Sequence, residues 1–274
     1  MELDWLPAPG KLNLFLHVLG LRADGYHELQ TVFRLIDRGD RVRISRREDG
    51  ELRFSGPFGA DNLCLRAARL LKQETSSRLG ADIELEKNLP VGGGLGGGSS
   101  DAATVLLALN RLWNLRIARS ELLQLGARLG ADVPVFIFGR SAVGEGIGER
   151  LTALALEPAW YLVMTPQVAV STKEIFAAAL TGESKRLTIP PFFPGRGRND
   201  LEAVVTARYP EVAAQLAWLR QRSAQARMTG SGACVFAELA SEAEARAIQS
   251  QMPRGMDGFV AQGLDRHPLY DWAE

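Results

Sequence analysis

The stretch LPVGGGLGGGSSDAA, residues 89–103, holds six glycines in seven positions, and two serines and an aspartate follow them at once. Glycine allows a backbone to turn freely and to approach a ligand closely. Serine and aspartate are preferred where helices begin, and the apolar residues that follow recur at helical spacing. The stretch therefore predicts a glycine loop that leads into a helix N-terminus, where free N–H groups and the helix dipole favour a phosphate.

The residues around this loop show which classes of glycine-rich loop it can belong to. Residues 81–86 alternate between apolar and charged side chains, as a half-buried strand does. A P-loop is excluded because no lysine lies in or directly after the glycines. Gly92, Gly94 and Gly97 match the dinucleotide pattern G-x-G-x-x-G, but no acid ends a second strand about 20 residues on. A dinucleotide loop is therefore disfavoured, and so is a flexible linker, which would not usually separate a strand from an amphipathic helix.

Composition excludes several classes of protein. The chain has 274 residues, with 32 basic and 32 acidic side chains, and this zero net charge argues against nucleic-acid or membrane-surface partners. Cys64 and Cys234 lack the spacing of a zinc site and are expected to be buried. The acidic N-terminal residues are followed by proline, and no apolar run approaches the roughly 18 residues of a membrane span. We therefore expect a cytoplasmic protein without a signal peptide.

Two further stretches place polar residues beside apolar segments. In KLNLFLHVLG, residues 11–20, Lys11 and Asn13 fall on the opposite strand face from the leucines that alternate with them. In LGADVPVFIFG, residues 129–139, Asp132 lies between a helix end and an expected strand, because Pro134 does not allow that helix to continue. Residues 41–54 read as a hairpin that turns at Gly50.

Taken together, these stretches resemble those of a known family. P-x-G-G-G-L-G-G-G-S-S resembles the ATP loop of the GHMP kinases, the superfamily of galactokinase, homoserine kinase and mevalonate kinase. Four further strings resemble family segments in the same order along the chain, namely PAPGKLNLFLHV, RADGYHEL, LGADVPVF and MTGSGACVF. The doubled glycine triplet is similar to that of the branch whose substrate is cytidine diphosphate methylerythritol.

The resemblance implies a role for individual residues. ATP and Mg²⁺ are the expected cofactors, Asp132 the expected catalytic base and Lys11 the cation that assists it. The expected ATP-binding residues are those of the loop: Pro90, Val91, Gly92, Gly93, Gly94, Leu95, Gly96, Gly97, Gly98, Ser99 and Ser100. The expected substrate-binding residues are Asn13, Tyr26, His27, Phe33, Thr172 and Phe176. We expect valine at Gly94 or Gly97 to weaken ATP binding and to leave the fold intact.

The implied fold is α/β (α+β), a two-domain GHMP kinase fold. Residues 1–155 would form a nucleotide-binding domain like domain 2 of ribosomal protein S5, and residues 156–274 a ferredoxin-like domain whose last residues return to the first. The expected partner is a small-molecule substrate, with no nucleic acid and no membrane, and the chain would be a monomer or a homodimer. Asp101 either faces away from the phosphates or helps to hold a cation, so the metal ligands stay open.

Two alternatives to this function remain. One is a nucleotide-binding module without catalysis, since a fold does not fix a function. Lys11 and Asp132 argue against it, because such a module has no use for both. The other is a kinase for homoserine or mevalonate, and Tyr26, His27 and Phe176 argue against that, because those compounds carry no base to stack on an aromatic ring.

Overall fold

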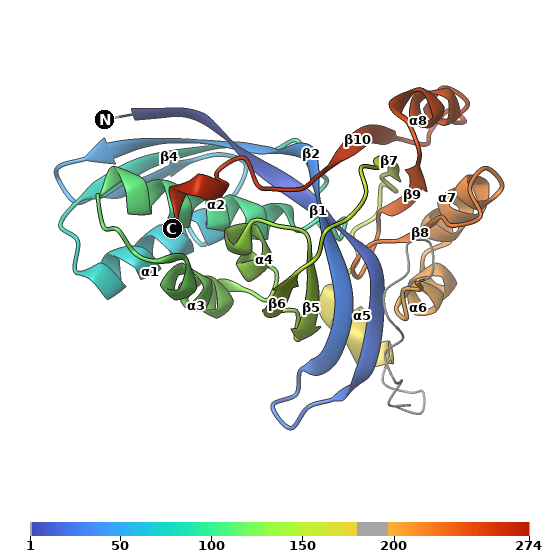
Figure 1. The fold of residues 1–274 in the computed structure, drawn as a ribbon, viewed down its shortest axis with the longest axis horizontal. Helices are drawn as coiled ribbons and strands as arrows, with labels where there is room; N and C mark the ends of the chain where they lie inside the picture. The colour runs from blue at the N-terminus through green and yellow to red at the C-terminus, as the bar shows by residue number, and fades with distance from the viewer. Residues whose placement is uncertain (1, 180–196, 274) are drawn as a thin grey trace.

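The computed structural model describes residues 2–179 and 197–273, and it has two lobes joined by a long antiparallel strand pair (Figure 1). The strands of the described part are β1 (Glu2–Leu21), β2 (His27–Arg47), β3 (Leu52–Ser55), β4 (Gly80–Glu86), β5 (Ala142–Gly146), β6 (Arg150–Ala153), β7 (Trp160–Met164), β8 (Arg227–Met228), β9 (Val235–Leu239) and β10 (Gly258–Leu264). The helices are α1 (Leu63–Thr75), α2 (Gly97–Leu112), α3 (Arg119–Leu129), α4 (Val133–Phe138), α5 (Thr172–Ala179), α6 (Glu202–Arg208), α7 (Pro210–Arg220), α8 (Glu242–Gln249) and the short 3-10 helix η1 (Tyr270–Trp272).

One connected sheet runs through the described residues, in the order β3-β4-β2-β10-β7-β9-β8. β1 pairs with β2 along nearly its whole length, and β5 pairs with both β2 and β6. The β1–β2 pair continues below the lobes as a protruding hairpin, beside which α5 lies (Figure 1). This mixed α/β architecture agrees with the expected fold class.

The strand pairing corrects the hairpin expected over residues 41–54. β3 does not pair with β2 but runs parallel to β4, which lies between them. The turn at Gly50 therefore crosses over β4, whose alternating residues Ile83 and Leu85 are buried against the helices. Local alternation predicted the strands correctly, but it contains no information on which strand is the neighbour.

Each lobe has its own apolar cluster. Helices α1 to α4 cover one face of the first lobe's strands, and their buried residues form one cluster with β2 and β4. A second cluster joins α6, α7, β7 and β9. The chain end returns to the first lobe, where Arg119 donates to the carbonyl oxygens of Ile137, Tyr270 and Ala273. Both termini therefore lie on the same lobe (Figure 1).

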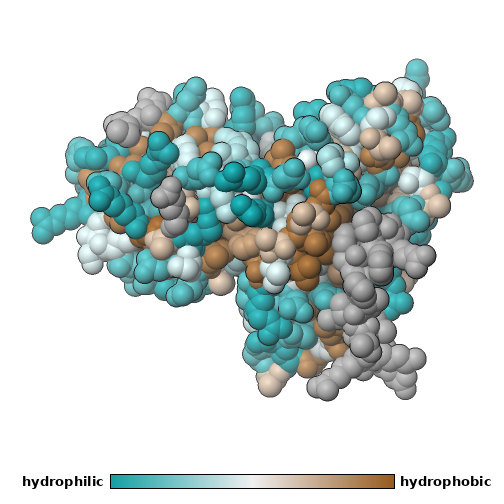
Figure 2. Space-filling view, in the orientation of Figure 1, coloured by the Kyte–Doolittle hydropathy of each residue, from teal (hydrophilic) through white to brown (hydrophobic). Residues whose placement is uncertain are grey.

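A third apolar cluster lies where the lobes meet. It combines Leu12 and Leu14 of β1 with Leu95 of the glycine loop, and with Cys234 and Phe236 at β9. Figure 2 shows apolar side chains gathered on this face of the molecule where the lobes and the β1–β2 hairpin come together. The glycine loop is thus fixed from both lobes.

Two expectations about single features can be compared directly with the structure. Cys64 and Cys234 are buried and free, as expected. Within residues 2–179 and 197–273, no helix has the length and apolar character needed to cross a bilayer.

Candidate active site

The glycine loop connects Pro90 to α2, and every second residue from Gly92 to Gly96 has a positive φ. Gly92, Gly94 and Gly96 have φ values of +72°, +78° and +71°. Alternation between right-handed and left-handed backbone turns successive N–H groups toward one side and forms a concave anion site. This backbone conformation is compatible with an anion site, and the phosphate role of the loop stays a prediction.

The start of α2 differs from the expectation. Its N-cap is Gly96, which makes no side-chain capping bond, so Ser99, Ser100 and Asp101 lie inside the first turns rather than at the cap. Without a capping side chain, the first N–H groups of the helix have no side-chain acceptor at that position, and they and the helix dipole favour an anion. The uncapped helix start is therefore compatible with an anion bound at the loop.

Leu95 explains how so much glycine forms a defined loop. Its side chain is 1 % exposed and belongs to the cluster between the lobes. Its carbonyl oxygen accepts a hydrogen bond of 3.0 Å from the backbone N–H of Lys11. The loop is therefore anchored to β1 at its centre, and this anchor sets the distance between the loop and Lys11.

Lys11 and Asp132 are 121 positions apart in sequence, and their charged groups meet. The Lys11 Nζ lies 3.4 Å from Asp132 Oδ2, with Lys11 buried and Asp132 36 % exposed. Asp132 is the N-cap of α4 but makes no capping bond, so its carboxylate is not occupied by the helix. Residues 133–138 form this helix and not the expected strand, because Pro134 is accommodated in the first turn of α4, where its missing N–H costs nothing.

Both residues face one cavity of about 860 Å³ between the glycine loop, the β1–β2 hairpin and α5. The cavity lining includes both expected catalytic residues and every expected substrate-binding residue, and all expected loop residues except Ser100. Ser100 is buried, and its hydroxyl has no hydrogen-bond partner in the described part of the chain. The sequence reasoning missed several lining residues, namely Thr31, Phe58, Leu63, Lys87 and Lys173.

Aromatic side chains form the end of the cavity away from the loop. The rings of His27 and Phe176 lie 5.0 Å apart, which joins the hairpin to α5. Burial lowers the pKa of His27, so its ring is neutral near pH 7. Tyr26 is 58 % exposed at the rim. The hydroxyl oxygens of Thr172 and Ser231 are 2.8 Å apart and connect α5 to the turn at Gly230.

A buried charge cluster lies behind the loop. Lys87 forms ion pairs with Asp40 and, at 3.1 Å, with Asp101. Asp40 also accepts the backbone N–H groups of Asn88 and Leu89 at 2.7 and 2.8 Å, which fixes the chain just before the loop. Burial, together with the negative charge of Asp40, raises the pKa of Asp101 to about 7. Asp101 is therefore held by Lys87, away from the Lys11–Asp132 cavity.

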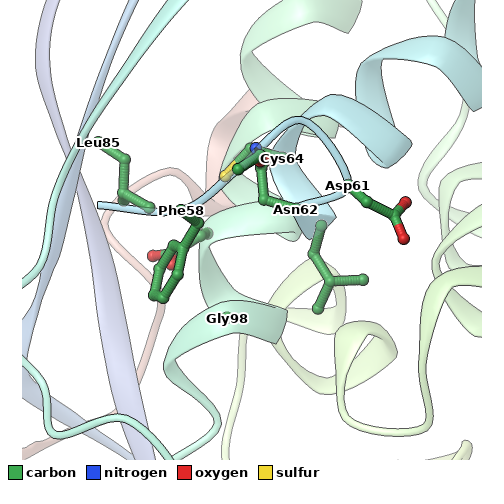
Figure 3. A pocket seen from close by; sticks show the side chains of 9 residues that line it. Phe58, Asp61, Asn62, Cys64, Leu85 and Gly98 are labelled. Atoms are coloured by element: carbon green, nitrogen blue, oxygen red, sulfur yellow. Dashed lines mark hydrogen bonds between the residues drawn. The ribbon is translucent and has the colours of Figure 1, made fainter. Parts of the chain in front are cut away.

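Asp101 instead borders a second, smaller cavity of about 400 Å³ at the start of α2. Figure 3 shows Phe58, Leu85 and Cys64 around this space above Gly98, while the carboxylate of Asp61 points away. Phe58, Leu63 and Gly98 line both cavities. The two cavities therefore adjoin at the first turn of α2.

The charges of the large cavity favour an anion. Among the described lining residues, Lys11, Lys87 and Lys173 are basic, and Asp132 is the acidic one. Low-dielectric walls strengthen the field of such charges, so the cavity favours an anion although the chain as a whole is neutral. Within the described residues no group of three or more His, Cys, Asp or Glu side chains could hold a metal ion by itself.

Comparison with known proteins identifies the family of the chain. The model of the GHMP kinases N terminal domain matches residues 62–140, and that of the GHMP kinases C terminal domain matches residues 194–258. A crystal structure of mevalonate kinase shares the fold, with a TM-score of 0.70 and 15 % identity over 96 % of this chain and 99 % of that one. Fold and site together define a kinase of the GHMP class.

Closer relatives identify the branch. The chain is 58 % identical to 4-diphosphocytidyl-2-C-methyl-D-erythritol kinase of Nitrosospira multiformis, over 98 % of this chain and 94 % of that protein. It is 56 % identical to the kinase of the same name from Thiobacillus denitrificans, over 97 % of both chains. A crystal structure of 4-(cytidine 5'-diphospho)-2C-methyl-D-erythritol kinase superposes with a TM-score of 0.82 and 35 % identity, over 96 % of this chain and 99 % of that one. The chain belongs to the 4-diphosphocytidyl-2-C-methyl-D-erythritol kinase family.

Proposed function

We propose that this enzyme transfers the γ-phosphate of ATP to the 2-hydroxyl of 4-diphosphocytidyl-2-C-methyl-D-erythritol. The relatives named above carry this kinase activity in their names, and they match almost the whole chain. The observation that carries the residue assignment is the 3.4 Å contact between Lys11 and Asp132 in a cavity walled by the glycine loop. This contact supports the proposal because it would put a carboxylate and an ammonium beside phosphates bound at the loop.

ATP would lie with its phosphates on the loop and its base in the smaller cavity. The N–H groups of the loop and of the first turn of α2 are the donors for the phosphate oxygens. The smaller cavity adjoins the loop at Gly98 and is lined by Phe58, Leu63 and Leu85, which suit the flat apolar faces of an adenine. The γ-phosphate would then point toward Lys11.

The substrate would occupy the other end of the large cavity. A cytosine ring is flat and would stack against the side chains of Tyr26, His27 and Phe176, a contact worth about 1–3 kcal/mol per base. Asn13, Phe33 and Thr172 line the stretch between these aromatics and the loop. The methylerythritol hydroxyl would therefore lie near Asp132, with the cytidine at the rim.

The chemistry then needs one proton acceptor and one fixed cation. Asp132 takes the proton of the substrate hydroxyl while the hydroxyl oxygen forms a bond to the γ-phosphorus of ATP. The bond between that phosphorus and the bridging oxygen breaks, and this oxygen leaves with ADP. A tertiary alcohol is a weak acid, so a carboxylate by itself is a weak base for it. The Lys11 ammonium stabilises negative charge on the oxygen and on the transferred group, because it is held within a buried, low-dielectric site.

Mg²⁺ is part of this proposal. It prefers oxygen ligands, keeps several waters and usually takes one or two protein oxygens together with substrate phosphates. The described cavity lining offers the carboxylate of Asp132 and the hydroxyl of Ser99 beside the loop, which fits that requirement. Mg²⁺ held there would neutralise phosphate charge. We do not propose Asp101 for this role, because its carboxylate pairs with Lys87 and borders the smaller cavity.

The test is turnover of substrate by variants of the two charged residues. Asp132→Asn should lower kcat by about 10²–10⁴-fold, which is typical for loss of a general base, and calorimetry should still detect binding of ATP and of the cytidyl substrate. Lys11→Met should behave likewise. Asp271→Asn is the matched control, because Asp271 is an exposed aspartate paired with Arg266 in the chain end.

Turnover is followed by ADP release with the cytidyl substrate, homoserine, mevalonate and galactose as acceptors. Wild-type turnover of another acceptor but not of the cytidyl compound would refute the substrate assignment. Near-normal turnover by Asp132→Asn would refute the role of Asp132 as base. The cytoplasmic location and the monomeric or dimeric state stay predictions.

A further inference from the structure

A directed chain of hydrogen bonds ends at the Lys11 ammonium. The Lys11 Nζ donates to Asn13 Oδ1 at 2.6 Å, and Asn13 Nδ2 donates to Thr31 Oγ1 at 2.8 Å. The Thr31 hydroxyl donates to the Phe15 carbonyl oxygen at 2.5 Å. Lys11, Asn13 and Thr31 are all at most 2 % exposed, so water does not compete for these groups.

The direction of this chain is fixed at its far end. A backbone carbonyl can only accept, so the single O–H of Thr31 donates to the carbonyl oxygen of Phe15. The Thr31 oxygen then has only lone pairs left for Asn13 and must meet the amide NH₂ rather than the amide oxygen. The amide oxygen is thereby turned toward Lys11, which as an ammonium can only donate. Thr31 thus selects one of the two orientations of the Asn13 amide.

A β-bulge brings these groups together from two strands. In the β1–β2 register, Asn13 pairs with Phe33 and Phe15 pairs with Val32, so one residue of β1 is extra between them. Bulges re-aim side chains and occur beside active sites. The backbone N–H of Asn13 is also held, by the Thr229 hydroxyl at 2.9 Å. With the backbone of Asn13 fixed, the side-chain amide can exchange the positions of its oxygen and NH₂ only by a flip of about 180°. The hydrogen bond to Thr31 opposes this flip.

The orientation of Asn13 affects the proposed base. The Lys11 ammonium donates to two neutral acceptors, Asn13 Oδ1 and the Gly94 carbonyl oxygen at 2.9 Å, and stands 3.4 Å from Asp132. If the amide turned over, its NH₂ would face the ammonium, which would then close on Asp132. A tighter ion pair would make the Asp132 carboxylate a weaker base toward the substrate hydroxyl.

We propose that Thr31 is a positioning residue for phosphoryl transfer, acting through Asn13 to keep Lys11 at its 3.4 Å distance from Asp132. This inference rests on the proposed function, because it assigns the same Lys11–Asp132 pair to catalysis. Thr31 touches neither reacting group. Its hydroxyl, and not its bulk, carries the effect.

The test compares two substitutions that separate the hydroxyl from the packing. Thr31→Val keeps the shape and removes the hydroxyl, whereas Thr31→Ser keeps the hydroxyl and removes a methyl group. We expect kcat to fall by about 10–100-fold in Thr31→Val, since misplacing a reacting group by about 1 Å can cost 100-fold. We expect Thr31→Ser to retain kcat within about threefold, because the directed chain is intact. A packing role predicts the reverse order, with Val tolerated and Ser impaired, and that order would overturn the proposal.

A double-substitution cycle tests whether Thr31 acts through Lys11. In the Lys11→Met background, Thr31→Val should lower kcat by no more than about twofold, because the group that it positions is gone. An unchanged 10–100-fold effect in that background would overturn the proposal. Thr104→Val is the matched control, since Thr104 is equally buried and donates to a backbone carbonyl, that of Pro7, outside both cavities. Wild-type turnover of the cytidyl substrate is measured first, so failure of the proposed function is seen separately from failure of the Thr31 assignment.

Discussion

Alanine at Gly94 should disable the enzyme by moving two backbone segments apart. A Cβ atom on Gly94 would lie 2.4 Å from the Thr229 carbonyl oxygen and 3.0 Å from that of Gly232, while ordinary contacts begin at 3.4 Å. The difference of 3.4 − 2.4 = 1.0 Å must be taken up by the glycine loop or by the turn at residues 229–232. Both are backbone, so no flexible side chain can yield.

The displacement reaches the proposed catalytic group directly. The carbonyl oxygen of Gly94 accepts a hydrogen bond of 2.9 Å from Lys11 Nζ, and a shift of 1 Å breaks it. We expect kcat to fall by about 100-fold, together with about 1–2 kcal/mol of strain at the left-handed φ of +78°. The crowding around Gly94 thus adds a local backbone shift to the weaker ATP binding expected for a side chain at this position.

Gly92→Ala is the matched control. Gly92 has nearly the same φ, +72°, but no heavy atom lies within 4 Å of its added Cβ. It should therefore lose about 1–2 kcal/mol from backbone strain and keep most of its turnover. Turnover is measured by coupled ADP release and stability by denaturant unfolding. Equal loss of turnover in the two variants would refute the reasoning, because strain would then explain both.

Two further predictions concern the support of the loop. Leu95→Ala should lower the free energy of unfolding by about 2–5 kcal/mol, the range for a buried leucine. It should also raise the KM for ATP, because Leu95 anchors the glycine loop. An unchanged KM together with the expected loss of stability would show that the loop does not need this anchor. Asp101 has its pKa raised to about 7, so the folded protein holds its proton more tightly than the unfolded chain, and its contribution to stability is lost as the pH rises from about 4 to 7. Unfolding of Asp101→Asn should therefore depend less on pH across this window than unfolding of wild type, and identical slopes would contradict the assignment.

Several parts of the site could be predicted from short stretches. The glycine loop and its position between β4 and α2 follow from residue type and period alone, whereas the amphipathic character expected for α2 was wrong, because the helix is buried on nearly all sides from Ser100 to Leu112. The family resemblance then named Lys11, Asp132 and the aromatic end, and these residues line one cavity. Short-range chemistry carried this information, because turns and helix starts depend on neighbours in sequence.

Prediction from the sequence failed where contacts join strands or charged residues that are far apart along the chain. The alternation of residues 11–17 does not continue through the bulge after Asn13, so Phe15 packs with Leu12 and Leu14 while Leu16 joins another cluster. Lys87 was missed because its importance comes from Asp40, 47 positions earlier, and from the loop beyond it. Residues 133–138 formed a helix because tertiary packing overrode the strand preference of valine and phenylalanine.

The sequence by itself determined that a glycine loop would precede a helix, a setting from which phosphate binding was predicted, because backbone freedom and helix ends are local properties. Only the tertiary structure decided that Asp132 meets Lys11, that Asp101 turns to Lys87, and that Thr31 orients Asn13. Each of these contacts joins residues from different elements. Their distances depend on strand order and bulges, which the cooperative packing of the two lobes fixes and no local pattern contains.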